Sequence, residues 1–94
     1  MSRPYRVIWK ARAVENDIAS FVVRATDEGH DAEAISMAMN EIDRLLSRQP
    51  STIGESRAFN ERILFVFPLV VDFEVFDDEE LVVVLRVRYS PKRN

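Results

Sequence analysis

The spacing of the hydrophobic residues in this 94-residue chain changes once, near Pro50. Between residues 14 and 46, apolar side chains recur every three or four positions, which is the spacing of one face of a helix. Between residues 62 and 89 the period falls to two and the apolar runs are short, as in β-strands. The sequence therefore predicts an α+β fold in which helices come first and most of the strands follow.

Two helices are expected before Pro50, and a short polar turn joins them into a helical hairpin. The first should end near Gly29, and Asp31 is suited to cap the second. Pro50 and Gly54 should close the second helix. The predicted buried stripe of the first helix is Val14, Ile18, Phe21, Val22 and Ala25. The predicted buried stripe of the second is Ile35, Ala38, Met39, Ile42, Leu45 and Leu46.

The remaining segments predict one short strand before the helices and an antiparallel three-stranded meander after them. The four predicted strands cover residues 5–9, 62–67, 69–76 and 81–89, and segment 55–60 is a candidate for a short extra strand. Pro68 separates the second strand from the third, and residues 77–80 form the tip of a β-hairpin. We expect one domain over residues 1–94, with residues 90–94 as a flexible tail.

The alternation of side chains predicts the pairing within that hairpin, because directly opposed residues point to the same face of a sheet. Pairing Phe73 with Leu85 joins the two apolar rows, requires a loop of odd length and sets Asp72 opposite Arg86. The predicted core face consists of Ile63, Phe65, Phe67, Val71, Phe73, Val75, Val83, Leu85 and Val87. The predicted open face carries Arg62, Asp72, Glu74, Arg86 and Arg88.

Composition excludes several kinds of site. The chain has no Cys, which rules out disulfides, thiolate catalysis and cysteine-ligated metals. Its one His, His30, excludes a metal site with two histidines, although it could touch a metal or simply belong to the turn between the helices. The acidic run 77–80 offers oxygen ligands for a hard cation, or a solvated hairpin tip. We expect no cofactor and no bound metal.

Charge and hydropathy indicate the surroundings in which the chain works. No apolar run reaches the length that spans a bilayer, so we expect no membrane association and a cytoplasmic location. The net charge is −3, which disfavours general binding to nucleic acid. Residues 72–80 hold six acids and no base, whereas residues 81–94 carry only basic charges. Residues 1–13 also carry a net charge of +4, so a local basic patch is compatible with the negative total if the two ends of the chain meet in space.

The order of these elements resembles the RelE/ParE superfamily, the toxin halves of bacterial type II toxin–antitoxin modules, which include plasmid-stabilisation-like proteins. The resemblance covers nearly the whole chain. It is carried by YRVIW (5–9) opening into a helix, by IDRLL (42–46) running to Pro50, by RILFV (62–66), by LVVDFEVFDD (69–78) and by VVVLRVRY (82–89). These segments match the family in hydrophobic pattern and at a few fixed positions. The resemblance implies a toxin that is inhibited by a cognate antitoxin.

Two activities occur in this family. RelE-like members cleave mRNA in the ribosomal A site with basic residues and often a C-terminal Tyr, and ParE-like members inhibit DNA gyrase without acting as nucleases. If the chain is RelE-like, the resemblance makes these residues the candidate catalytic groups: Arg62, Arg86, Arg88 and Tyr89, with Lys92 or Arg93 as additions. The chain departs from the nucleases at Val70, where they place an Arg, and a pair of lysines in the preceding strand is reduced to Arg62.

The same residues have structural interpretations, which stay open at this point. The arginines can pair across strands with Asp72 and Glu74, and these two acids would also repel a phosphate backbone. Tyr89 can instead be a residue at the end of a strand whose only role is packing. The alternative to an active toxin is a non-catalytic or degenerate protein-binding module on the same scaffold, including one that binds gyrase without chemistry. The ribosome with its mRNA and DNA gyrase are both possible targets, and the sequence leaves the oligomeric state open.

Overall fold

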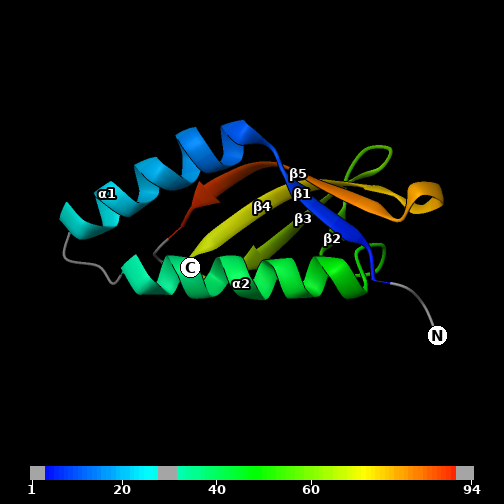
Figure 1. Ribbon diagram of the computed structural model, residues 1–94, viewed down its shortest axis with the longest axis horizontal. Coiled ribbons are helices and arrows are strands. Elements are labelled where there is room, and N and C mark those ends of the chain that lie inside the picture. The colour runs from blue at the N-terminus through cyan, green and yellow to red at the C-terminus, as the bar shows by residue number, and fades with distance from the viewer. Residues whose placement is uncertain (1–3, 28–31, 91–94) are drawn as a thin grey trace.

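The computed structural model describes residues 4–27 and 32–90, and its elements follow the predicted order (Figure 1). The elements are β1 (Arg6–Trp9), the π-helical segment η1 (Arg12–Ile18), α1 (Ala19–Asp27), α2 (Ala32–Arg48), β2 (Glu55–Ser56), β3 (Glu61–Val66), β4 (Leu69–Phe76), the 3₁₀ turn η2 (Asp77–Glu79) and β5 (Leu81–Tyr89). The bounds of β4 and β5 are those predicted. Predictions that involve Gly29, His30, Asp31 and residues 91–94 fall outside the described residues.

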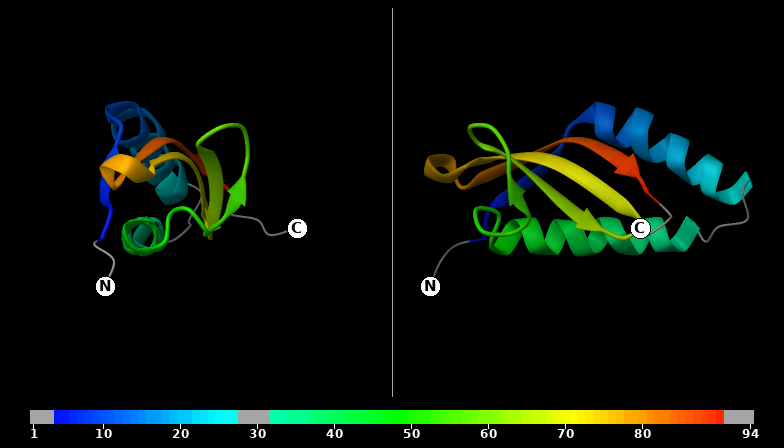
Figure 2. Two further views of the ribbon diagram at one scale, coloured as in Figure 1. Left: turned by 90° about the vertical axis from the view of Figure 1, so that its right-hand side faces the viewer. Right: turned by 180° about the vertical axis from the view of Figure 1, so that it is seen from behind.

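The strands form one mixed sheet in the order β1-β5-β4-β3-β2. β1 runs parallel to β5, and the other neighbours are antiparallel. The tentative extra strand in segment 55–60 is confirmed as β2, so the sheet has five strands rather than four. The helices lie along one side of the sheet and leave its other face open (Figures 1 and 2).

The second helix buries the stripe that its sequence predicts. Four residues of α2 are buried in the common core, namely Ile35, Ala38, Ile42 and Leu46, and Met39 and Leu45 pack against it. Their three- and four-residue spacing puts all six on one face of an α-helix. The long polar face, which includes the Glu41–Arg44 ion pair, remains in solvent.

The first helical segment differs from the prediction because it begins as a π-helix. Ala13 and Ile18 are both buried and lie five positions apart, which is the spacing of hydrogen bonds in a π-helix. Val14 and Val22, in contrast, are 42% and 37% exposed. The predicted stripe of the first helix is therefore wrong at these two valines. It holds at Ile18 and Ala25, which are buried, and at Phe21, which packs against the core.

β4 behaves as predicted and β3 does not. Leu69, Val71, Phe73 and Val75 of β4 alternate strictly as buried residues. In β3, however, Leu64 is buried opposite Val71, and three predicted core residues lie elsewhere: Ile63 is half-buried, Phe65 is 47% exposed and Phe67 is 45% exposed. Every residue from Ile63 to Phe67 is apolar, so alternation in β3 carries no information about which set faces the helices.

A β-bulge in β5 explains the remaining difference. Phe73 pairs with Val84 and Asp72 pairs with Arg86, so Leu85 is the extra residue. The predicted Phe73–Leu85 pair and the odd loop length are therefore wrong, while the opposition of Asp72 and Arg86 is confirmed. On the tip side of the bulge the buried residues are Val82 and Val84 rather than Val83 and Leu85; beyond it, Val87 is buried as predicted.

Candidate functional site

The end of the open face beyond the bulge gathers the basic side chains of β5. Arg88 lies opposite Val70, and its guanidinium donates to Asp72 Oδ1 at 3.0 Å. The Arg88 side chain is 52% exposed and that of Asp72 is 28% exposed, so water screens the pair. We call Val70, Asp72, Arg86 and Arg88 the arginine end of the sheet.

Arg86 is the second exposed cation of the arginine end. It lies directly opposite Asp72, whose carboxylate binds Arg88. Within residues 4–27 and 32–90, Arg86 forms no ion pair of its own. The position that carries an Arg in the nucleases is Val70 here, between Phe65 and Arg88 on the same face. The carboxylate of Asp72 thus lies near both arginines, at the place where an RNA phosphate would need to bind.

Tyr89 belongs to the other face of the sheet. Its partner across the ladder is Leu69, which is fully buried. The ring stacks on Phe21 of α1 with the centroids 5.7 Å apart, and the guanidinium carbon of Arg24 lies 5.5 Å from the centroid of the Tyr89 ring. This cation–π and stacking arrangement joins β5 to α1. It separates Tyr89 from Arg86 and Arg88.

Arg62 also lies apart from the arginine end, and its predicted place on the open face is wrong. It pairs with Phe73, whose side chain is in the core, so Arg62 starts out on the helix side. Its guanidinium donates to the carbonyl oxygens of Ile53 and Gly54 at 3.0 and 3.2 Å. Gly54 has φ +74°, and a Cβ there would come within 2.2 Å of the Ile63 carbonyl oxygen. Arg62 therefore stabilises the turn that leads into β2.

The sequence did not single out Asp17, which closes the edge of β5. β1 ends opposite Val84, so the outer edge of β5 beyond that point has no neighbouring strand among the described residues. Asp17 of η1 instead accepts the Val87 backbone N–H at 2.9 Å. A π-helical turn allows Ile18 to reach the core while its neighbour Asp17 reaches the strand edge. The only sequence signal was an acid beside a buried position.

A second polar cluster lies at the opposite end of the sheet. The Tyr5 hydroxyl donates to Asp77 Oδ1 at 2.5 Å, and the Ser51 hydroxyl donates to the same oxygen at 2.7 Å. The hydrogen bond from Tyr5, followed by that from Ser51, lowers the pKa of Asp77. The hydrogen bond to the Asp77 carboxylate raises the pKa of Tyr5. This cluster fixes the hairpin tip to β1 and to the turn after α2.

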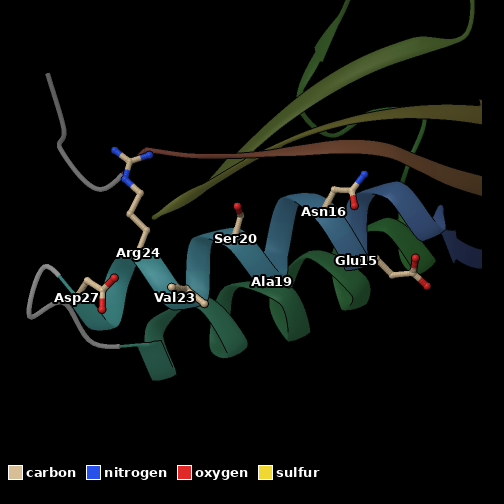
Figure 3. Close-up of a pocket in the computed structure, with 7 residues that line it drawn as sticks. All are labelled: Glu15, Asn16, Ala19, Ser20, Val23, Arg24 and Asp27. Carbon is tan, nitrogen blue, oxygen red and sulfur yellow. The ribbon is translucent and has the colours of Figure 1, made fainter.

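One hollow on the surface reaches the arginine end at Val70, and its other lining residues belong to β3 and to segment 54–57 before it. The depression in Figure 3 runs along the outer side of η1 and α1, where Ala19 and Ser20 leave room between Asn16 and Arg24. All of its lining residues belong to one continuous helical stretch, so it is an open surface rather than a cleft. The described residues contain no group of three His, Cys, Asp or Glu side chains that could hold a metal ion. None of the described helices is long and apolar enough to span a bilayer.

The fold defines a class of small α+β protein, in which a helical hairpin covers a mixed sheet whose first strand is the parallel one. This is the fold of the RelE and ParE toxins, which confirms the predicted fold class. No protein-family model matches the sequence, and no curated protein is significantly similar to it. The likeness is therefore carried by three-dimensional structure.

Three solved structures illustrate this likeness. A chain of the toxin–antitoxin complex RelBE2 from Mycobacterium tuberculosis matches with a TM-score of 0.72 at 18% identity, covering 98% of each chain. The chromosomal ParDE system of P. aeruginosa matches with the same TM-score and identity, over 95% of this chain and 99% of the other. The isolated E. coli RelE toxin matches with a TM-score of 0.61 at 12% identity, over 96% and 87% of the two chains.

Proposed function

We propose that this chain is the toxin component of a bacterial type II toxin–antitoxin module and is inhibited by a cognate antitoxin in the cytoplasm. The observation that carries the proposal is the end-to-end match to proteins of the RelBE2 and ParDE systems. Those matches leave almost no part of either chain uncovered. A fold alone does not specify an activity, so the mode of action is argued below from the site.

The site supports binding to a target in preference to RNA cleavage. Cleavage by a RelE-like mechanism needs several cations, often with a tyrosine, around one phosphate. Here the four candidate residues Arg62, Arg86, Arg88 and Tyr89 point to three different surroundings. A phosphate approaching Arg88 also meets the carboxylate of Asp72, which costs Coulomb energy and displaces an existing hydrogen bond.

Of the two targets that the family suggests, this arrangement therefore favours a protein target such as DNA gyrase over mRNA on the ribosome. The open face supplies surface for such contacts. Phe65 and Phe67 are each close to half-exposed, and Ile8 on β1, at the other edge of the sheet, is 42% exposed. Apolar surface of this kind on a small protein is typical of interaction sites.

The proposal is tested by inducing the chain in a bacterial host without its neighbouring genes. We expect growth to stop, and co-expression of a small protein encoded next to the chain should restore it. The same neighbour should co-purify with the chain as a stable complex. Continued growth, translation and DNA supercoiling under strong induction would show that the chain is not an active toxin.

A pair of variants separates the alternatives within the proposal. Arg88→Ala combined with Tyr89→Phe removes the groups that a nuclease would need at the arginine end. Retained growth arrest by this double variant supports action by binding, and loss of arrest together with loss of mRNA cleavage supports RelE-like chemistry. Arg44→Ala, an exposed arginine on the solvent face of α2, serves as the charge control.

A further inference from the structure

Phe59 is an unusual residue at the turn between β2 and β3. It is fully exposed, at 101% of the reference area, and its backbone has φ +56°. A left-handed backbone favours Gly and disfavours a bulky aromatic residue. Exposure of the whole ring brings no hydrophobic stabilisation either. Folding therefore gives no reason for a Phe at this position, and strained exposed positions of this kind cluster at functional surfaces.

The turn holds Phe59 in place through the backbone on both sides of it. Arg57 N–H donates to the Glu61 carbonyl and Glu61 N–H donates to the Ala58 carbonyl, both at 2.9 Å. Val75 N–H donates to the Asn60 carbonyl at 3.1 Å, which ties the turn to β4. The ring is thus presented to solvent from a defined loop, so that a partner would pay little ordering entropy to bind it.

Two adjoining hollows separate this turn from the β4–β5 hairpin tip. One, of about 150 Å³, has Phe59 at its rim, and the other, of about 320 Å³, is lined by Asp78 and Glu79. Both include Asn60, Val75 and Asp77, so they form one shallow groove. The β2–β3 turn and the hairpin tip lie at the same end of the long axis in Figure 1 and in the right view of Figure 2. We call this groove with its two walls the tip groove.

The two walls of the tip groove favour the same kind of ligand. The face of an aromatic ring attracts a cation, and the Phe59 ring is fully exposed. Arg62 lines the same hollow, but its guanidinium is bound to the carbonyl oxygens of Ile53 and Gly54. Asp77 is engaged by Tyr5 and Ser51, whereas Asp78 and Glu79 are exposed and form no ion pair within residues 4–27 and 32–90. A guanidinium or ammonium group between them would meet negative charge on one side and a ring on the other.

We propose that the tip groove is a docking site for an extended segment of a partner protein that carries arginine or lysine beside apolar residues. The charged group lies between the Phe59 ring and the carboxylates of Asp78 and Glu79, and an adjacent apolar side chain packs on Phe76, which lines the groove and is partly exposed. This site lies at the opposite end of the sheet from Arg88, so it is independent of the proposed mode of action at the arginine end.

The test uses a fluorescent octapeptide of alternating arginine and leucine at about 0.15 M salt, with a glutamate–leucine peptide of equal length as the control. Fluorescence anisotropy gives the affinity, and amide chemical shifts of the labelled protein locate the peptide. We expect binding of the basic peptide only, with shifts concentrated at residues 57–60 and 75–79. Phe59→Gly should weaken binding about three- to five-fold while the melting temperature stays equal or rises.

Matched variants distinguish a defined site from general attraction to acids. Asp78→Asn with Glu79→Gln should weaken binding, whereas Glu15→Gln with Glu41→Gln, an equal change of charge on the helices, should not. Phe65→Ala is the control for loss of an exposed ring. The proposal is overturned if Phe59→Gly binds as well as the parent, if the shifts spread over all acidic surfaces, if no binding occurs, or if Phe59→Gly instead abolishes self-association of the chain.

Discussion

The two ends of the β4–β5 ladder differ in charge, in strand register and in the partners of their polar groups. At the arginine end, Asp72 binds Arg88 and lies opposite Arg86, and the Tyr89 ring packs on the other face against α1. At the other end, the hairpin tip carries a run of acids, and one of them binds the hydroxyls of Tyr5 and Ser51. At the end that would hold a nuclease site, one of the two arginines is therefore paired with a carboxylate, whereas Asp78 and Glu79 at the acidic end form no ion pair within residues 4–27 and 32–90.

The bulge at Leu85 separates these two ends and allows both to keep apolar side chains in the core. Val84 and Val87 are both buried although they are three positions apart, which regular alternation forbids. One extra residue restores the alternation on each side. The difference between the ends shows that a parity argument holds within a regular ladder and fails across a bulge.

The largest effect should come from the core on the tip side of the bulge. Phe73→Ala removes a ring that is fully buried beneath the helices and should lower the free energy of unfolding by about 3–5 kcal/mol. Phe65→Ala, on the open face, should cost far less because its ring is already 47% exposed. Urea unfolding of both variants measures the contrast, and equal losses would contradict the assignment of the two faces.

The next effect concerns the edge of β5 at the arginine end. Asp17→Ala removes the acceptor of the Val87 N–H and should destabilise the protein by about 1–3 kcal/mol. Asp17→Asn keeps an acceptor oxygen and should recover most of that loss. Hydrogen exchange at Val87 should accelerate in the alanine variant, and unchanged protection there would contradict the role of Asp17.

Deletion of Leu85 tests the bulge itself. Without this residue, Val82, Val84 and Val87 alternate regularly, and Arg86 can still pair with Asp72. We expect the shortened chain to fold with a loss of less than about 2 kcal/mol, measured by thermal and urea unfolding. Failure to fold would show that the two ends depend on the bend that the bulge introduces.

The positions of the helices and strands could be predicted from the sequence better than the side on which each of them is buried. The changes of hydrophobic period and the breaks at Pro50 and Pro68 were enough to place α2, β4 and β5. The sequence could not show which face of β3 packs against the helices, because both of its alternating sets of residues are apolar. The bulge and the π-helical turn each insert a residue into a regular period, and no local residue type marks either. The sequence also could not predict that the candidate residues lie apart, because the position of Arg62 depends on the register of β3.

A smaller effect is expected from neutralising the acid of the arginine end. Asp72→Asn removes the charge that Arg88 binds and should change stability by less than about 1 kcal/mol, because the pair is screened by water. Affinity for a short single-stranded RNA should increase, with a steeper dependence on salt. Glu41→Gln gives the same change of net charge on α2. An equal increase in that variant would mean that total charge matters rather than the arginine end.

The smallest effect concerns pH at the tip. Because the folded-state pKa of Asp77 is lowered, its contribution to stability is present above the ordinary value of 3.8 and is lost as pH falls through the lower folded value. Because the pKa of Tyr5 is raised, its contribution is present below 10.0 and is lost as pH rises through the higher folded value. Tyr5→Phe should weaken both dependences in melting curves across pH. Identical curves for the variant and the parent would contradict a stabilising hydrogen bond between Tyr5 and Asp77.

The measurement that tests the central claim most directly is a map of mRNA 5′ ends in bacteria in which the chain has been induced. The account predicts that growth stops while translated mRNAs gain no new ends at codons in the ribosomal A site, because the arginine end lacks an assembled cleavage site. New ends at A-site codons that disappear in the Arg88→Ala variant would contradict it and would make the chain a ribosome-dependent nuclease.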